Sequence, residues 1–292
     1  MLSILIPVYN QDVRKLVYTL ANQCTKLKIN FQILCFDDGS RENYKLKNRE
    51  LASKININYT EMKENLGRSK IRNWLGKAAY FDYLLFLDGD SGVKDKHFIK
   101  KYMEMLPTDH VIYGGRSYQK KKPARQKKVL HWKYGMTREA LPARKRVKHP
   151  FLNFQSNNFL VPAAVFERVH FLENVEGYGY EDLQYASLLQ KQGISILHID
   201  NPVFHDGLED NSVFLAKTRK AIDNLVMLEN KNQLPGTRLM LFHQKLYRFG
   251  IQHLLFRFIE KYLKQIEKNL LSPHPSILLF NLWKWYLYAQ KK

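Results

Sequence analysis

Acidic or polar residues follow three apolar runs near the start of this sequence. Tyr9-Asn10, Asp37-Asp38 and Asp88-Gly89-Asp90 each come directly after such a run. Two carboxylates around one glycine can hold a hard divalent cation, because the glycine lets backbone and ligand approach closely. Such a cation can neutralise a phosphate leaving group. An acidic turn after a strand has the same appearance, so the triplet alone is a weak indication.

The elements between these clusters predict how they are positioned. Apolar runs at 2–8, 31–36, 55–60 and 83–87 are typical of strands, and residues 13–24 and 67–80 have apolar side chains at helical spacing. Strands alternating with helices predict an α/β fold with a mostly parallel sheet flanked by helices. Ligands of such sheets bind beyond the carboxyl ends of the strands, where the three clusters fall.

The second half of the chain continues this pattern and then changes. Further strands are predicted at 111–113, 158–161 and 194–199, and a helix at 182–192. Residues 119–150 contain twelve lysines and arginines and a single acid, and three prolines. We interpret this basic segment as a long, partly mobile loop. From residue 212 onward the pattern predicts only helices.

Composition restricts the classes of protein and partner. The chain has 292 residues, 45% of them hydrophobic, which suffices for a packed core. A formal charge of +20 indicates an anionic partner, such as nucleic acid, a membrane surface or a charged substrate. Two cysteines are too few for a disulfide framework, and no run is apolar and long enough to span a membrane. We therefore expect a cytoplasmic protein, with peripheral attachment to the inner face of the cell membrane as an option.

Five motifs occur in an order that resembles the family 2 glycosyltransferases. They are IPVYN, DDGS, NLGRSKIRN, FLDGDS and GYGYEDLQYA. The resemblance covers about residues 1–210 and implies the GT-A fold, a Rossmann-like and mostly parallel central sheet flanked by helices. We accordingly expect a catalytic domain at 1–210, which includes the basic loop, and a helical C-terminal extension at 211–292.

The resemblance assigns donor-side roles to residues that match the family motifs. Positions matching the nucleotide-sugar pocket are Pro7, Tyr9, Asn10, Asp38, Gly67, Arg72, Asp88 and Gly89. Asp90 matches the usual metal ligand, Asp88 contacts the ribose or the metal, and His205 is a third candidate ligand. A lone histidine is more often structural. The implied cofactor is Mn²⁺ or Mg²⁺.

The same resemblance assigns the reaction. Asp182 matches the catalytic base of an inverting transfer, and Glu181 is its candidate partner at the acceptor. An ionised carboxylate can take the proton of the acceptor hydroxyl, and the start of a helix favours that ionised form. A pair of acids that caps a helix is the structural alternative. Candidate acceptor-binding residues are Asn157, Tyr178 and Tyr180.

The function implied is transfer of a hexosyl or N-acetylhexosaminyl group from a nucleotide sugar, with UDP favoured, in cell-surface polysaccharide synthesis. The acceptor would be a hydroxyl of a glycan or a lipid-linked molecule. The alternative is a basic protein with an inactive transferase-like fold that binds nucleic acid or an anionic surface. Nucleic acid is the less favoured partner, because no groove-reading or base-stacking motif is recognisable. A nucleotidyltransferase would need a Gly- and Arg-rich loop where residues 9–12 stand.

Overall fold

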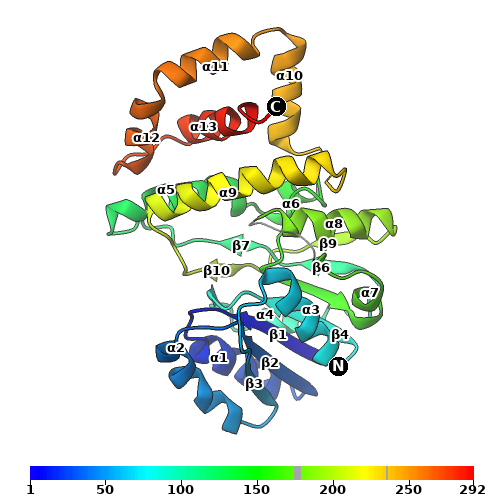
Figure 1. Cartoon of the computed structure of the whole chain (residues 1–292). Coiled ribbons are helices and arrows are strands. Elements are labelled where there is room, and N and C mark those ends of the chain that lie inside the picture. Colours follow the sequence, from blue (N-terminus) through cyan, green and yellow to red (C-terminus); the bar gives the residue numbers. More distant parts are fainter. Residues whose placement is uncertain (174–178, 235) are drawn as a thin grey trace. The chain divides into compact units, whose positions relative to one another are not determined.

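The computed structural model describes residues 1–173, 179–234 and 236–292. The chain forms two compact units (Figure 1). The first, called here the sheet unit, comprises Met1–Ser117, Ala140–Asn174 and Tyr185–Gly207. The second, the helical unit, comprises Tyr118–Glu139, Val175–Gln184 and Leu208–Lys292. Each unit has its own hydrophobic core.

A seven-stranded sheet forms the centre of the sheet unit. Its strands, in the order β3-β2-β1-β4-β8-β6-β9, are β3 (Ile57–Glu61), β2 (Phe31–Asp37), β1 (Leu2–Val8), β4 (Tyr83–Leu87), β8 (Asn158–Pro162), β6 (Val111–Tyr113) and β9 (Ile196–His198). Neighbouring strands are parallel, except that β8 runs antiparallel to both β4 and β6. The predicted α/β architecture with a mostly parallel sheet is confirmed.

Helices cover both faces of this sheet (Figure 1). Helices α1 (Arg14–Lys26) and α4 (Phe98–Met103) pack on one face. On the other face lie α3 (Arg68–Ala78), α7 (Ala163–Arg168) and the part of α8 (Glu181–Lys191) that begins at residue 185. Strands buried on both sides need apolar residues at nearly every position, which explains their continuous apolar runs. The shorter α2 (Glu42–Asn48), η1 (Arg49–Ser53) and α6 (Ala143–Arg146) complete the unit.

The buried face of α3 differs from the one predicted by hydrophobicity alone. Trp74 is 46% exposed, whereas Arg72 and Asn73 are almost completely buried. The two polar side chains are accommodated because each has buried partners. Asn73 exchanges two hydrogen bonds with the backbone of Phe171, at 2.8 and 3.0 Å, and Arg72 forms an ion pair that is described below. Specific polar partners thus override the apolar periodicity at this helix.

A second, three-stranded sheet lies in the same unit. It consists of β5 (Ser91–Gly92), β10 (Val203–His205) and β7 (Arg116–Ser117), in that order. Strand β10 is antiparallel to β5 and parallel to β7. These strands are only two or three residues long, but they bring together segments that are about a hundred residues apart in the sequence.

The helical unit is built around α13 (Ile277–Ala289), whose aromatic side chains fill its core. The other helices of this unit are η2 (Gln126–Lys128), α5 (Val129–Tyr134), η3 (Gly135–Glu139), α9 (Asn211–Asn230), α10 (Arg238–Arg248), α11 (Gln252–Lys261) and α12 (Leu263–Leu271). The helices predicted beyond residue 212 are therefore present. Among helices of the described residues, none has the length and apolarity required to cross a bilayer.

The basic segment 119–150 was expected to be a loop, and that expectation is wrong for much of its length. It contains η2, α5, η3 and α6. Val129 and Leu130 are buried, and Leu130 belongs to the core of the helical unit. The many lysines and arginines hid this short apolar stretch, which folds because it finds a tertiary partner.

Candidate functional site

Hydrogen bonds join the carboxyl ends of β1 and β2. The Asp38 N–H donates to the Val8 carbonyl at 2.7 Å. The Asn10 N–H donates to Ser40 Oγ at 2.7 Å, and Asn10 Oδ1 accepts from the Arg41 N–H at 2.9 Å. Asn10 has a φ of 52°, in the left-handed region that asparagine tolerates better than most residues. These bonds hold the IPVYN and DDGS motifs, both predicted to bind the nucleotide sugar, next to each other.

Asp38 positions the segment that precedes α3. Its two carboxylate oxygens accept hydrogen bonds from the Leu66 and Gly67 N–H groups, at 2.6 and 3.1 Å. The Asn65 side chain donates to the Asp38 carbonyl at 2.8 Å. Burial raises the pKa of Asp38, although the two amide donors oppose this effect. The structure therefore brings together Asp38 and Gly67, both predicted to bind the nucleotide sugar.

Tyr9 extends from this region into solvent. The residue is 54% exposed, unlike the buried strand that precedes it. An exposed ring at the end of a parallel strand is available to stack on a planar ligand. Pro7, another predicted pocket residue, lies close to Gly89 of the acidic triplet. Its carbonyl oxygen would be 3.0 Å from a Cβ placed at Gly89. A Cβ at Gly89 would also lie 3.2 Å from the Val13 side chain, so glycine allows a close approach of the two segments.

Asp88 lies between two arginines. Arg72 Nη2 contacts its Oδ1 at 2.6 Å, and Arg116 Nη2 contacts its Oδ2 at 3.4 Å. Arg72 is 2% exposed, its guanidinium carbon lies 5.5 Å from the centre of the Phe171 ring, and its Nη1 donates to the Arg68 carbonyl at 3.1 Å. The resemblance assigned Arg72 to the nucleotide sugar. In this structure it contacts Asp88, itself a predicted donor-site residue.

Asp90 forms the other half of the acidic triplet and contacts His205. His205 Nδ1 is 3.3 Å from Asp90 Oδ2, because β5 and β10 pair Ser91 with His205. Burial acts to raise the pKa of Asp90, but its contact with His205 and the charges of Arg116 and Arg68 outweigh it. They hold the pKa of this carboxyl well below its ordinary range. The structure thus places Asp90 and His205, two predicted metal ligands, in direct contact.

These side chains offer a carboxylate, which suits Mn²⁺ or Mg²⁺, and an imidazole, which a transition metal such as Mn²⁺ accepts more readily than Mg²⁺. The described residues contain no group of three or more His, Cys, Asp or Glu side chains arranged to hold a metal ion. Asp88 is engaged by Arg72 and Arg116. A cation bound by few protein ligands completes its coordination with phosphate oxygens and water. The residues present therefore fit a cation that binds together with a diphosphate.

Asn157 is a buried amide beside the triplet. Its backbone carbonyl accepts a hydrogen bond from the Asp88 N–H at 3.1 Å. Its side chain is 2% exposed, and neither amide atom has a hydrogen-bond partner in the described parts of the chain. Leaving such a group unpaired costs about 1–3 kcal/mol, so the position calls for an explanation such as a ligand. Asn157 was predicted on the acceptor side.

The ED motif begins α8, with Glu181 and Asp182 in its first turn. Glu181 is buried and Asp182 is partly exposed. Tyr180, just before the helix, has a φ of 69° and packs partly against the core of the helical unit. Burial raises the pKa of its hydroxyl. Tyr178, the other predicted acceptor aromatic, lies outside the described residues.

Sequence reasoning missed two arginines of this site. Arg116 contacts Asp88, and the charges of both Arg116 and Arg68 act on Asp90. Arg116 follows Gly114-Gly115 at the end of β6, so its place after a predicted strand was the signal that could have revealed it.

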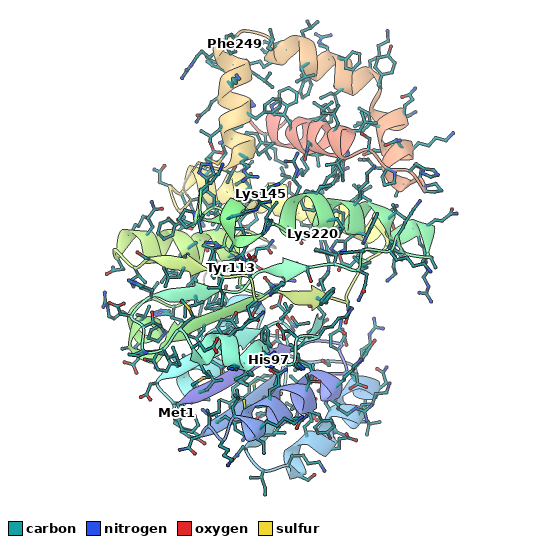
Figure 2. All side chains as sticks on the ribbon, turned by 180° about the vertical axis from the view of Figure 1, so that it is seen from behind. Met1, His97, Tyr113, Lys145, Lys220 and Phe249 are labelled. Carbon is teal, nitrogen blue, oxygen red and sulfur yellow. The ribbon has the colours of Figure 1, made fainter. Side chains whose placement is uncertain are left out.

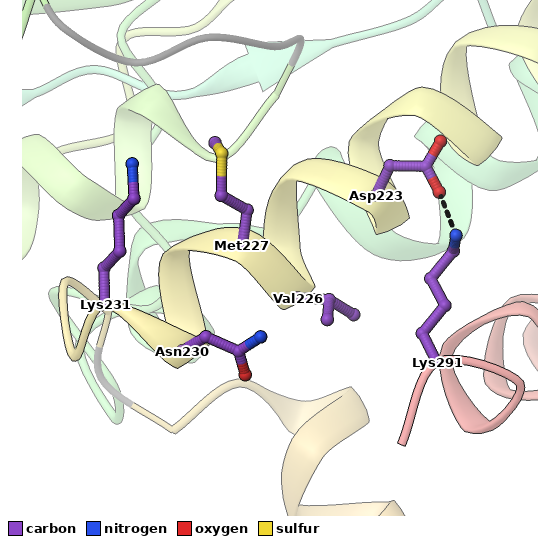
Figure 3. A pocket seen from close by; sticks show the side chains of 6 residues that line it. All are labelled: Asp223, Val226, Met227, Asn230, Lys231 and Lys291. Carbon is purple, nitrogen blue, oxygen red and sulfur yellow. Dashed lines mark ion pairs between the residues drawn. The ribbon is translucent and has the colours of Figure 1, made fainter.

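The helical unit contains a pocket of a different kind (Figure 3). Its lining residues are Asp223, Val226, Met227, Asn230, Lys231 and Lys291. Asp223 and Lys291 form an ion pair at 3.0 Å across it. None of the predicted site residues lines this pocket.

Several known proteins resemble this chain in sequence or in structure. The chain is 35% identical over 121 residues to the chondroitin synthase of Escherichia coli, a match that spans 40% of this chain but only 17% of that protein. The structure resembles TarS of S. aureus, with a TM-score of 0.52, 17% identity and coverage of 77% of this chain and 65% of TarS. It also resembles the mannosyltransferase PcManGT of Pyrobaculum calidifontis, with a TM-score of 0.58, 11% identity and coverage of 99% and 85% of the two chains.

The profile that describes "Glycosyl transferase family 2" matches residues 3–169, more than half of the sequence. This match covers the ends of β1, β2 and β4, where Asp38, Asp88 and Asp90 lie. The predicted family and the predicted fold are both confirmed. The chain belongs to glycosyl transferase family 2.

Proposed function

We propose that this protein transfers a sugar from a UDP-sugar, with inversion at the anomeric carbon, to a hydroxyl of a glycan or lipid-linked acceptor. The observation that best supports this proposal is the Asp90–His205 contact beside the charges of Arg116 and Arg68. Positive charge from two guanidinium groups thus acts on this carboxylate in addition to its contact with the imidazole. The same set suits the diphosphate of a nucleotide sugar together with its cation.

The donor is proposed to bind along the ends of β1 and β2. Tyr9 offers an exposed ring, and Asn10 and Asp38 form the adjoining polar wall. TarS has been solved with UDP, and PcManGT with GDP-Man and Mn²⁺, so proteins of this fold bind nucleotides of both kinds. We favour UDP for this chain from the family resemblance, and TarS, which has the same fold, has been solved with UDP.

Departure of the nucleoside diphosphate is proposed to depend on positive charge near Asp90. Mn²⁺ or Mg²⁺, when bound, would supply Lewis-acid stabilisation of the departing diphosphate. Asp90 and His205 would hold it, with Asp88 contacting the ribose or the cation. The chain itself provides Arg116 and Arg68, whose charges already act on this carboxylate. Preorganised charge of this kind stabilises the transition state without further rearrangement.

The acceptor side is proposed to use the ED motif. Asp182 would take the proton of the acceptor hydroxyl as that oxygen attacks the sugar. Its position in the first turn of α8 favours the ionised carboxylate that this role needs. Glu181, Asn157, Tyr178 and Tyr180 would bind the acceptor, and Asn157 offers an amide that lacks a partner in the described structure.

The acceptor and its location are proposed from similarity and charge. Part of the chain is similar to a chondroitin synthase, which favours a hexosyl or N-acetylhexosaminyl donor and a role in cell-surface polysaccharide synthesis. The formal charge of +20 favours an anionic partner. We place the enzyme in the cytoplasm, attached peripherally to the inner face of the cell membrane.

A screen of nucleotide sugars tests this proposal. UDP-, GDP- and TDP-sugars are compared by thermal shift and by donor hydrolysis, each with and without Mn²⁺. We expect UDP-sugars to raise the melting temperature and to be hydrolysed only when Mn²⁺ is present. His205→Gln should raise the Mn²⁺ concentration needed for half-maximal hydrolysis. Failure of all nucleotide sugars and nucleoside diphosphates to bind with Mn²⁺ present would remove the basis of the proposal.

A further inference from the structure

Helix α11 has apolar side chains on two neighbouring sides, of which one is packed and the other is exposed. On one face Leu255, Phe256 and Ile259 pack into the core of the helical unit. Phe256 lies 4.8 Å from Tyr286 of α13, measured between ring centres. A single packed face accounts for the fold of this helix. The second apolar face therefore needs a separate explanation.

The second face is a stripe of exposed residues, called here the outer stripe. It consists of Ile251, Leu254, Phe258 and Tyr262. Their spacing of three, four and four residues places them on one side of the helix. Leu254 is 75% exposed and Phe258 is 56% exposed. The rings of Phe258 and Tyr262 lie 5.0 Å apart, so the exposed residues form a continuous surface.

The end of α10 extends this apolar surface. Tyr247 and Phe249 are 69% and 63% exposed, and Phe249 is labelled at the turn into α11 (Figure 2). Ile251 directly precedes α11, and its N–H donates to the Leu246 carbonyl of α10 at 3.2 Å. This hydrogen bond fixes the turn between α10 and α11. Six large apolar side chains thus stand exposed along one short stretch of 16 residues, 247–262.

Basic residues accompany the outer stripe. Residues 238–268 contain seven lysines and arginines and only two acids. Arg257 and Lys261 are exposed and lie one helical turn apart beside Phe258. Lys261 Nζ is 5.6 Å from the centre of the Tyr262 ring. Apolar and aromatic side chains bordered by cations are the features of a helix that lies in the interface of an anionic bilayer.

We propose that α11 and the end of α10 form the surface by which this protein binds an anionic lipid membrane. This inference rests on the membrane association proposed above and names the surface responsible. A second copy of the chain is a poorer occupant, because a two-fold contact would bring two such basic sets together. A charged glycan is poorer too, because the aliphatic Ile251 and Leu254 offer it neither hydrogen bonds nor an aromatic face.

Vesicle co-sedimentation of the full chain, without any nucleotide, tests this proposal. One set of vesicles contains phosphatidylcholine alone, and the other contains equal parts of phosphatidylcholine and phosphatidylglycerol. The wild type should bind only the anionic set. Leu254→Gln combined with Phe258→Gln should weaken this binding about a hundredfold, since each loses the burial of a large side chain. Arg257→Gln combined with Lys261→Gln should weaken it about thirtyfold.

The matched control is Ile55→Gln, which removes an apolar side chain that is 88% exposed in the sheet unit. It should bind vesicles as the wild type does. Wild-type binding by the Leu254/Phe258 variant, or binding of the wild type to neither set, would overturn the proposal. So would a wild-type dimer that this variant converts to a monomer, which would make the stripe a subunit interface. Donor hydrolysis is measured on each variant, so loss of the proposed chemistry and loss of membrane binding are distinguished.

Discussion

Gly207→Ala is a direct test of the position of Asp90. Gly207 follows β10 and lies directly against the Asp90 carboxylate. A Cβ at this residue would lie 2.5 Å from Asp90 Oδ2 and 3.1 Å from Asp90 Cβ, whereas ordinary van der Waals contacts are 3.4–4 Å. The alanine methyl group and the carboxylate therefore cannot occupy their present positions together.

The clash is relieved most easily by movement of the carboxylate. Asp90 Oδ2 must retreat by about 1 Å to reach an ordinary contact distance. That movement alters its 3.3 Å contact with His205 Nδ1. Displacement of a catalytic group by about 1 Å can lower a rate about a hundredfold, which corresponds to about 2.7 kcal/mol of transition-state stabilisation. We expect kcat/KM for Mn²⁺-dependent donor hydrolysis to fall by about this factor.

The assay titrates Mn²⁺ at fixed UDP-sugar for the wild type, Gly207→Ala and a matched control. Gly236→Ala serves as the control, because the added methyl group would lie 3.8 Å from its nearest neighbour, Leu241. The melting temperature of each variant shows whether the fold is intact. The reasoning is refuted if Gly207→Ala retains both wild-type kcat/KM and the wild-type Mn²⁺ concentration for half-maximal activity.

Three further predictions concern the reaction, acid stability and packing. Asp182→Asn should lower transfer at least about a hundredfold and leave donor affinity unchanged in calorimetry; an equal loss of donor affinity would place Asp182 on the donor side. Burial and the neighbouring Arg146 lower the pKa of His198 from 6.5 to about 4. On acidification the unfolded chain is therefore protonated first, and stability falls from about pH 6.5 downward, by about 2 kcal/mol at about pH 5. Urea unfolding should show this loss, and His198→Gln should reduce it; an unchanged pH dependence in the variant would exclude His198. Gly76→Ala should cost about 2 kcal/mol in the same assay, since its Cβ would lie 2.2 Å from the Phe166 ring; wild-type stability would show that Phe166 repacks freely.

Much of the sheet unit could be predicted from the sequence, because its strands are continuous apolar runs that only a buried sheet accommodates. The runs at 2–8, 31–36 and 83–87 match β1, β2 and β4 within one residue. The helix at 182–192 was likewise placed to within one residue. Local periodicity is a reliable signal for elements of this length. The acidic clusters could be located from the same pattern, because each of them directly follows an apolar run.

Helix α3 and the basic segment fold in ways that local sequence patterns do not predict. Hydrophobicity alone favours Trp74 for the buried face, yet Arg72 and Asn73 are buried instead, because Asp88 and Phe171 provide their partners. In the segment 119–150, abundant charge concealed a short helix that contributes Leu130 to a core. The burial of these side chains depends on partners about 16 to 150 residues away in the sequence. Local sequence patterns, which extend over a few helical turns, do not include such partners.

The sequence by itself determined the family, the order of the strands and helices, and the acidic triplet that follows β4. It could do so because motifs and apolar periodicity are local properties of the chain. Only the tertiary structure decided which residues surround that triplet. Strands of two or three residues are too short to predict, yet β5, β7 and β10 place His205 beside Asp90 and Arg116 beside Asp88. These contacts join residues 28 and 115 positions apart, and they exist because backbone pairing between distant segments places the side chains in register.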